Sequence, residues 1–418
     1  MIVQKAYKFK IKTNAREKGF FSKVAGSVRL VWNKSLALQK ANCEYINRQF
    51  VRLGGYSMNE SEAKKLKKQL YREYFPTGFD IITKALVPIW KKSEELSFLN
   101  ECPAQSLQKP LGDLDKAFFK AFTKKGGFPK FKKKGLRDSI YFPQGFKIKN
   151  NKVFLPKLGW VKFFKTRDIE GTIKNITVTS DGFGNWFASF CCTEQERNIA
   201  RRTIGEIGID LGVTNFSALS NGELIKKPTS IKNLLAIKKR VARAVSRKKL
   251  GGKNRAKTFL VLRKVEVKIA NIRKDFLQKT STLLSKNHAL IVAEDLKILN
   301  MSKSAKGTKK NPGVNVKAKS GLNREILANG WGDFRTILKY KQEYSGGIFK
   351  VVNPINTSRT CSCCGVIDKN SRVRQEWYAC LHCGYEIHAD TNAAINILAA
   401  GRVALGDMDN ISCLAQES

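Results

Sequence analysis

The sequence is poor in histidine and has no long apolar run. Only three histidines occur among 418 residues, at positions 288, 382 and 388, so chemistry that relies on a histidine base is poorly supplied. No apolar stretch is long enough to cross a membrane. The N-terminal segment MIVQKAYKFKIK alternates like a strand and lacks the apolar region of a signal peptide. We therefore expect a cytoplasmic protein with no membrane partner.

Acidic residues are also scarce. The chain has 78 Lys and Arg against 34 Asp and Glu, a formal net charge of +44. Such an excess repels itself in the compact state, and a polyanion would offset that repulsion. Nucleic acid is the favoured polyanion because each neutralised phosphate also releases counterions. A merely solvated basic face, or a protein of the membrane surface, is the alternative.

The pattern of apolar residues divides the chain into regions. Turn residues and short alternating runs between 139 and 193 predict four or five strands. Together with the N-terminal strand, these predict a small β-barrel or sandwich, residues 1–14 and 126–202. Residues 15–125 have helical periodicity and form a helical insertion.

The region after residue 203 predicts an α/β domain. Two apolar strands end in Asp210 and Glu294, two basic helices span 229–248 and 254–286, and a helix over 324–344 precedes a strand over 347–353. Residues 302–323 are rich in Lys, Gly and Ser and predict a mobile loop. Residues 399–418 lack a periodic pattern and predict a disordered tail.

Three carboxylates are candidate metal ligands. Asp210 and Glu294 end neighbouring strands, where an α/β sheet exposes functional groups, and Asp390 begins a helix in HADTNAAINIL. Each alone could be a helix cap. Clustered carboxylates repel unless a cation joins them, and Mg²⁺ prefers such oxygen ligands. Two such ions about 3.5–4 Å apart would serve phosphodiester hydrolysis without any histidine.

Four cysteines have the spacing of a zinc site. Cys361 and Cys364 form one Cys-x-x-Cys pair, and Cys380 and Cys383 form a second pair 15 residues later. A closed site of four cysteines leaves no open position for substrate, so one structural Zn²⁺ is expected. Cys363 and His382 could replace a ligand, but the spacing favours the four named cysteines.

With these residues in view, the chain resembles the TnpB family of transposon-encoded RNA-guided nucleases, which are related to compact type V CRISPR effectors. The resemblance covers most of the chain and is carried by the stretches GIDLGVTNFSALSNG, KIANIRKDFLQKTSTLL, IVAEDLKILNM, NGWGDF, TSRTCSCCG, CLHCGYEIHADTNAAINIL, FPKFKKKG and LPKLGWVKF.

The resemblance implies a fold and a set of sites. It implies an RNase H-like RuvC nuclease domain (203–356 and 385–398) with Asp210, Glu294 and Asp390 at the catalytic positions. The zinc ribbon (357–384) would be a target nucleic-acid-binding lobe. The β domain with its helical insertion would be a wedge-like barrel and a recognition lobe. The loop 302–323 would lie at the position of a lid over the nuclease pocket, or would be solvated filler.

The resemblance also implies partners: a guide RNA, and double-stranded target DNA with a short flanking motif. Gln108 and Gln144 stand where the family reads that motif, although either could be an ordinary surface glutamine. Phosphate contacts are expected from basic residues of the two long helices, each of which could instead be a solvated charge: Arg247, Lys248, Lys249, Arg255 and Lys257.

Two other functions remain as alternatives. An RNA-guided DNA-binding repressor without cleavage would typically have lost active-site acids, whereas all three are present. A DNA transposase proper would also use carboxylates and metal, but the four-cysteine ribbon before Asp390 argues against it. The sequence therefore predicts an RNA-guided, Mg²⁺-dependent DNA endonuclease.

Overall fold

The computed structural model describes residues 2–74, 82–134, 138–195, 205–308 and 310–414. The chain divides into two compact units, residues 1–197 and 198–418. Each unit is described by itself. Within the described ranges, every helix is too short or too polar to span a bilayer.

The first unit combines a sheet with helices inserted after its first strand. Its helical elements are α1 (Ala15–Arg52), α2 (Glu60–Tyr74), η1 (Ile82–Leu86), α4 (Val87–Lys92), η2 (Glu94–Glu101) and α5 (Ala104–Phe122). Its strands are β1 (Ile2–Lys12), β2 (Ser139–Phe142), β3 (Lys147–Lys149), β4 (Lys152–Leu155), β5 (Gly159–Phe163), β6 (Thr172–Ser180) and β7 (Trp186–Gln195).

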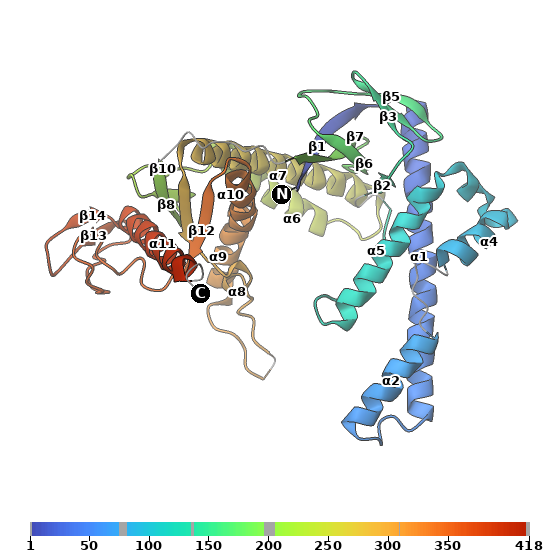
Figure 1. Cartoon of the computed structure of the whole chain (residues 1–418), viewed down its shortest axis with the longest axis horizontal. Coiled ribbons are helices and arrows are strands. Elements are labelled where there is room, and N and C mark those ends of the chain that lie inside the picture. Colours follow the sequence, from blue (N-terminus) through green and yellow to red (C-terminus); the bar gives the residue numbers. More distant parts are fainter. Residues whose placement is uncertain (1, 75–81, 135–137, 196–204, 309, 415–418) are drawn as a thin grey trace. The chain divides into compact units, whose positions relative to one another are not determined.

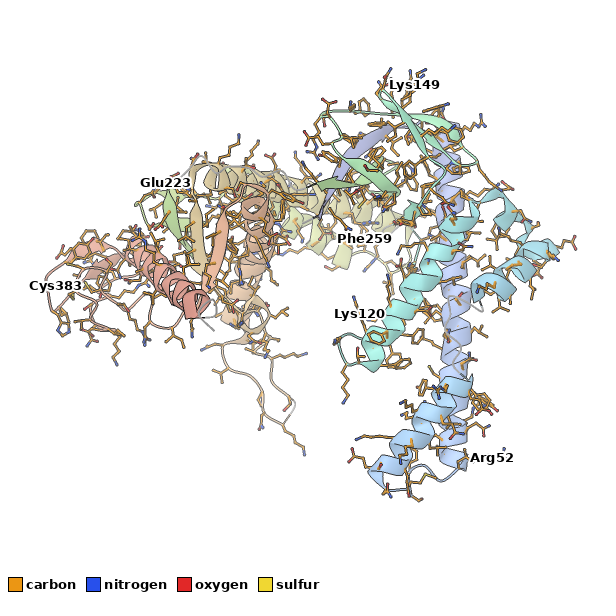
Figure 2. All side chains as sticks on the ribbon, in the orientation of Figure 1. Arg52, Lys120, Lys149, Glu223, Phe259 and Cys383 are labelled. Atoms are coloured by element: carbon orange, nitrogen blue, oxygen red, sulfur yellow. The ribbon has the colours of Figure 1, made fainter. Side chains whose placement is uncertain are left out.

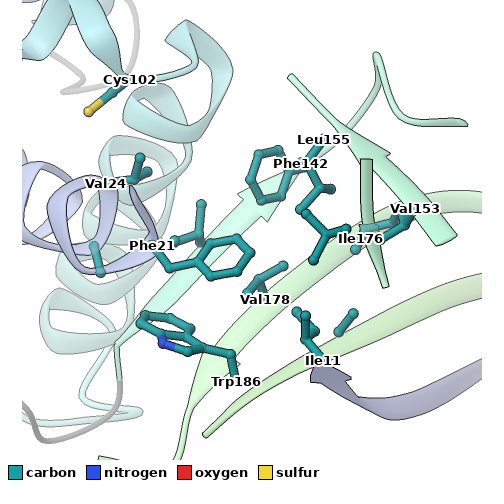
Figure 3. Packing of buried hydrophobic residues seen from close by; sticks show 14 of the residues in the cluster. Ile11, Phe21, Val24, Cys102, Phe142, Val153, Leu155, Ile176, Val178 and Trp186 are labelled. Atoms are coloured by element: carbon teal, nitrogen blue, oxygen red, sulfur yellow. The ribbon is translucent and has the colours of Figure 1, made fainter. Parts of the chain in front are cut away.

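The seven strands have the order β2-β6-β7-β1-β5-β4-β3, and every neighbouring pair is antiparallel. One face of the sheet packs against α1, so that Phe21 lies beside Trp186 with ring centroids 5.1 Å apart (Figure 3). The same core takes in Ile11, Val153 and Val161. Because side chains alternate along a strand, the residues between these positions face outward.

The second unit contains the remaining elements. Its strands are β8 (Glu206–Leu211), β9 (Ser217–Leu219), β10 (Leu224–Ile225), β11 (Leu290–Glu294), β12 (Ile348–Val352), β13 (Trp377–Ala379) and β14 (Glu386–His388). Its helices are α6 (Thr229–Ser246), α7 (Lys253–Asn287), α8 (Ile298–Met301), α9 (Val316–Asn329), α10 (Trp331–Tyr344) and α11 (Ala389–Leu414).

The central sheet of this unit has the order β10-β9-β8-β11-β12. Strands β8, β11 and β12 are parallel, whereas β9 runs antiparallel to both β8 and β10. Ile209 and Ile291 face a core formed with α7, α9 and α10. Val292 on the opposite face packs with Ile397 of α11, which lies along the sheet in Figure 1.

A glycine in β8 allows α11 to lie unusually close to the sheet. A Cβ added at Gly208 would be 2.0 Å from the carbonyl oxygen of Ala394 and 2.9 Å from the backbone nitrogen of Leu398. Gly401 makes a second close approach, since its Cβ would be 2.4 Å from a methyl group of Val292. Glycine is the residue that fits where two backbones approach this closely.

Three sequence-based boundaries are wrong. Residues 399–414 belong to α11 and are not a disordered tail, because Gly401 and Leu405 pack against the β11 and β12 side of the sheet; residues 415–418 lie outside the described residues. The predicted loop 302–323 is helical from Val316 onward. The ribbon extends past residue 384, since β14 pairs with β13.

We predict that Gly208→Ala destabilises the second unit by about 3 kcal/mol or more, because the added methyl group meets backbone atoms that cannot rotate away. Denaturant unfolding monitored by circular dichroism would measure the loss. Gly321→Ala is the matched control: a Cβ at this position of α9 has nothing within 4 Å, and alanine should add up to about 1 kcal/mol of stability. Equal effects of the two substitutions would contradict the packing argument.

Candidate metal-binding active site

Asp210 and Glu294 lie on adjacent parallel strands at the same edge of the sheet. The register pairs Ala293 of β11 with Ile209 of β8, so Glu294 and Asp210 come next to each other. Neighbouring strands are about 4.8 Å apart, and residues in this register point to the same face. That face is the one covered by α11, because Ile209 points to the opposite core.

Asp390 reaches the same region from the first turn of α11. Its negative charge, like that of Glu294, raises the pKa of Asp210. The three acids are therefore electrostatic neighbours.

Burial and repulsion oppose the ionised form of Asp210. The pKa of this carboxyl is raised to about 7, first by burial and then by the charges of Glu294 and Asp390; the Arg372 guanidinium and a backbone hydrogen bond from Leu211 act in the opposite direction. A divalent cation bound here would relieve the same repulsion. Partly buried carboxylates without a histidine are a donor set that suits Mg²⁺.

Glu294 is buried, at 8% exposure, and has a fixed hydrogen-bond partner. The hydroxyl of Thr357 donates to Oε1 of Glu294 at 2.6 Å. Burial raises the pKa of Glu294, and this hydrogen bond lowers it. Thr357 thus favours the charged form that a cation would bind, and it holds the carboxylate in one orientation.

Arg372 places a positive charge beside Asp390. Its Nη2 atom lies 3.4 Å from Oδ1 of Asp390 and donates to the carbonyl oxygen of Gln375 at 2.7 Å. Neither Arg372 nor Thr357 was predicted from the sequence. Thr357 is one of several hydroxyl residues in TSRT, and Arg372 is one of 78 basic residues, so no local signal separated either from its neighbours.

The four predicted cysteines come together. Their sulfur atoms all lie within 4.8 Å of one another, with 3.7 Å between Cys361 and Cys383 and 3.6 Å between Cys364 and Cys380. Sulfurs bonded to one tetrahedral zinc at 2.3 Å would be about 3.8 Å apart. This donor set fits zinc. The exposed Cys363 is not part of the group, and His382 instead faces Asp368, at 3.7 Å.

Each of the two cysteine pairs lies in a turn of its own, and the two turns have the same geometry. Gly365 and Gly384 have φ values of +76° and +70°, and each donates its N–H to the carbonyl oxygen of the first cysteine of its pair, at 2.9 and 3.0 Å. A residue with a Cβ would be strained at this φ. The repeated turn explains why a glycine follows each Cys-x-x-Cys pair.

Polar contacts tie the ribbon to α11. The side-chain amide of Asn396 donates to the carbonyl oxygens of Thr357 and Thr360, at 2.9 and 2.7 Å. Asn392, which is fully buried, donates to Thr360 and accepts from the backbone of Ser362. The segment that carries Thr357 is therefore fixed to the same helix that carries Asp390.

The predicted basic contacts surround the turn between α6 and α7. Arg247, Lys248, Lys249 and Lys257 are exposed. Two of the five also stabilise the turn: Lys248 donates to the hydroxyl of Thr258 at 2.6 Å, and Arg255 donates to the carbonyl oxygen of Lys248 at 3.0 Å. The other three remain available to a polyanion or to solvent.

Gln108 and Gln144 belong to the first unit. Gln108 is half-buried in α5, and Gln144 is exposed in the turn after β2. Their elements are joined by a hydrogen bond of 2.7 Å from the hydroxyl of Ser106 to the carbonyl oxygen of Tyr141. Their predicted role in reading a flanking motif stays a prediction.

We predict that Asp210→Asn stabilises the chain when no divalent cation is added, because it removes a charge that burial and two neighbouring acids disfavour. The gain should be roughly 1–3 kcal/mol at pH 8. Since the folded pKa is raised above its unfolded value, ionised Asp210 costs stability progressively from about pH 4 to pH 7. The gain should therefore shrink at pH 5.

Denaturant unfolding at pH 8 and pH 5 would measure both effects. Asp275→Asn serves as the control, because Asp275 is exposed on α7 and forms an ion pair with Lys279 on the surface of the same helix; its effect should stay within about 0.5 kcal/mol. A destabilising or pH-independent effect of Asp210→Asn would show that the acid is not under electrostatic strain.

Comparison with known proteins places this geometry in a family. Three family models match: "Helix-turn-helix domain" over residues 1–45, "Probable transposase" over 189–305 and "Cas12f1-like, TNB domain" over 331–397. The first of these regions is a strand followed by the start of the long helix α1. The region 189–305 contains Asp210 and Glu294. The region 331–397 contains the four cysteines and Asp390.

Relatives cover almost the whole chain. InsQ of Escherichia coli (strain K12), whose name describes an RNA-guided DNA endonuclease, is 38% identical over 96% of this chain and 93% of its own length. A relative from Streptomyces pristinaespiralis with the same description is 29% identical over 98% of this chain and 92% of its own.

Two further matches are shorter or more distant. Cas12f1 of Sulfoacidibacillus thermotolerans, a CRISPR-associated endodeoxyribonuclease, is 43% identical over 16% of this chain and 15% of its own. A solved Cas12f1–sgRNA–target DNA complex matches 95% of this chain and 98% of its own chain, with 15% identity and a TM-score of 0.47. The near-complete match to InsQ shows that the chain belongs to the TnpB family of RNA-guided nucleases.

Proposed function

We propose that the chain is an RNA-guided DNA endonuclease that hydrolyses DNA phosphodiesters at Asp210, Glu294 and Asp390. The observation that supports this site is the register of β8 and β11, which brings Asp210 and Glu294 together on the face of the sheet covered by α11. Asp390 lies in the first turn of that helix. The relatives that match almost the whole chain have names that describe the same activity.

The three acids would hold divalent metal ions, and two Mg²⁺ ions are the proposed number. Bound in this position, such ions would activate the attacking water and stabilise the departing oxygen. Glu294 would bind through a carboxylate that Thr357 orients. Asp210 would also gain from the cation, because burial and its two acidic neighbours disfavour its ionised form.

Arg372 has a second role in this proposal. It lies beside Asp390, so its guanidinium can donate to a phosphate oxygen of a strand that enters the pocket. Charge-assisted hydrogen bonds of this kind fix the position of a phosphodiester. A zinc ion in the ribbon would be structural, and it would hold the segments that carry Thr357 and Arg372.

The fold and charge support the rest of the proposal. The sheet order β10-β9-β8-β11-β12, with β8, β11 and β12 parallel, supports the assignment of an RNase H-like RuvC domain. The first unit, a sheet with inserted helices, supports the wedge-like and recognition assignments. The charge of +44 favours binding to a guide RNA and to double-stranded target DNA, whose sequence the guide would read by base pairing.

The segment 302–315 is proposed as a lid over the nuclease pocket. It is closed at its base by α9: Lys319 donates to the carbonyl oxygen of Met301 at 2.8 Å, and Asn323 donates to those of Ser302 and Lys303 at 3.0 Å. These contacts fix the base of the segment to α9.

Cleavage of labelled target DNA by the purified complex of protein and RNA tests the proposed function. We predict cleavage that requires Mg²⁺, and a loss of at least about a thousandfold in Glu294→Gln because a metal ligand is removed. Guide RNA and DNA binding should persist in that variant. Glu223→Gln, at an exposed acid of the same unit, should cleave like the wild type. Guide-dependent DNA binding without any Mg²⁺-dependent product would indicate a repressor instead.

A second experiment tests the role of Thr357. Thr357→Val keeps the shape of the side chain and removes the hydroxyl that donates to Glu294. We predict a cleavage rate about tenfold lower and a higher Mg²⁺ concentration for half-maximal rate, because hydrogen bonds to metal ligands fix their orientation. Thr357→Ser should restore both values. An unchanged Mg²⁺ dependence in Thr357→Val would assign Thr357 to packing alone.

A further inference from the structure

A buried asparagine of α11 holds the backbone on both sides of Cys361, the first cysteine of the group. The side chain of Asn392 donates to the carbonyl oxygen of Thr360 at 2.7 Å and accepts from the backbone N–H of Ser362 at 2.9 Å. Asn392 is 0% exposed. Because a buried amide is costly to leave unpaired, these two hydrogen bonds fix the chain around Cys361 to the helix.

A second asparagine, one helical turn later, extends this attachment toward the acids. Asn396 donates to the carbonyl oxygens of Thr357 and Thr360, at 2.9 and 2.7 Å. Residues four apart lie on the same face of a helix, so the two asparagines present neighbouring amides to the segment 357–361. The segment is itself a turn, because the backbone N–H of Thr360 donates to the carbonyl oxygen of Asn356 at 3.0 Å. It is therefore attached to α11 near both of its ends.

The two ends of this segment contact different sites. At its start, the hydroxyl of Thr357 donates to Oε1 of Glu294 at 2.6 Å. At its end, the sulfur of Cys361 lies 3.7 Å from that of Cys383. Figure 2 labels Cys383, which marks the cysteine group in the ribbon. One short segment thus joins the cysteine group to a proposed metal ligand of the acid site.

Arg372 is a second contact from the ribbon to the acids, and its effect on a bound cation has the opposite sign. Its Nη2 atom lies 3.4 Å from Oδ1 of Asp390, so its charge would repel a cation beside that acid. The Arg372 side chain is 30% exposed, and 3.4 Å is long for a charge-assisted hydrogen bond. The bond from Thr357 to Glu294 is shorter and buried, so we expect it to decide the sign.

We infer that zinc in the ribbon and a divalent cation at the three acids bind cooperatively, with Asn396 as the positioning residue that joins the two sites. This inference rests on the proposed function and deepens it by naming how that site is regulated. A four-cysteine ribbon orders when its sulfurs share a metal, because the binding free energy is also folding free energy. An ordered ribbon keeps the segment 357–361 in place. Thr357 then holds Glu294 in one orientation, as partners of metal ligands do.

Cooperativity of this kind is reciprocal. If zinc raises the cation affinity of the acid site by some factor, a cation at the acids raises the zinc affinity by the same factor. The path through Asn396 adds a second requirement, because loss of its amide must reduce both factors while both sites still bind metal. A ribbon that only stabilised the domain would show the same zinc dependence with or without that amide.

The test uses the full chain without nucleic acid, in zinc-loaded and zinc-stripped forms. Mn²⁺ is the probe of the acid site, because it prefers oxygen ligands and its free form can be counted by electron paramagnetic resonance. Mn²⁺ binding that disappears in Glu294→Gln is assigned to the acid site. Zinc affinity is measured by competition with a zinc-selective chelator, with and without saturating Mn²⁺, and circular dichroism checks that each variant is folded.

We predict that zinc raises the Mn²⁺ affinity of the wild type at least about fivefold, and that Mn²⁺ raises the zinc affinity by the same factor. In Asn396→Ala both factors should fall below about twofold, because Thr357 loses an amide that holds it. Thr357→Val removes the contact to Glu294 and should give the same result with Asn396 intact. Asn271→Ala, at an exposed asparagine of α7, is the matched control and should keep the wild-type factors.

Three outcomes would count against these conclusions in different ways. An unchanged Mn²⁺ affinity after zinc removal would overturn the inference, and the proposed function would stand if the zinc-loaded chain with its RNA cleaves DNA. Undiminished cooperativity in both Asn396→Ala and Thr357→Val would overturn the path from Cys361 to Glu294. If Glu294→Gln loses no Mn²⁺ binding and the wild type does not cleave DNA, the proposed function itself fails.

Discussion

The position of Asp390 depends on how closely α11 approaches the central sheet. Gly208 and Gly401 remove the two Cβ atoms that would hold the helix and the sheet apart. Gly208 lies two residues before Asp210 on the same face of β8, so the contact that seats the helix is adjacent to the acid that Asp390 must approach. A shift of about 1 Å at this contact would move one proposed metal ligand relative to the other two, and sites of this kind tolerate little displacement.

Ionising Asp210 and Glu294 costs free energy in the absence of a cation, and their surroundings only partly offset that cost. Thr357 stabilises the charged form of Glu294, and Arg372 opposes the rise in the pKa of Asp210. Both residues come from the segment between β12 and α11 that also contains the cysteines. The segment that forms the ribbon therefore also supplies the two side chains that lower the pKa values of Glu294 and Asp210. A folded ribbon is then a condition for the positions of Thr357 and Arg372 beside the acids, although a metal held by the four cysteines would touch no substrate.

Local features of the chain were enough to predict some parts of this structure and not others. Asp210 and Glu294 follow apolar runs, so their strands and their common edge could be predicted from pattern alone. The cysteine group follows from spacing within 23 residues. Thr357 and Arg372 could not be found, because their roles arise from contacts made across 63 and 18 residues. The end of α11 was misread for a related reason: Gly401 and Gly406 weaken the helical signal, while packing against Val292 and the β12 side of the sheet stabilises the helix.

Each of the two units brings side chains of one charge sign together, acids in the second unit and lysines in the first. The second unit brings Asp210 close to Glu294 and Asp390, and the first unit aligns Lys12, Lys162, Lys152 and Lys149 across four neighbouring strands. In each case like charges are adjacent on a well-packed scaffold, and the core behind them holds them in place: Ile209 and Ile291 behind the acids, Val153 and Val161 behind the lysines. Ions of opposite charge bound at either place would relieve the repulsion between like charges, and each such binding event would add stability to the folded state.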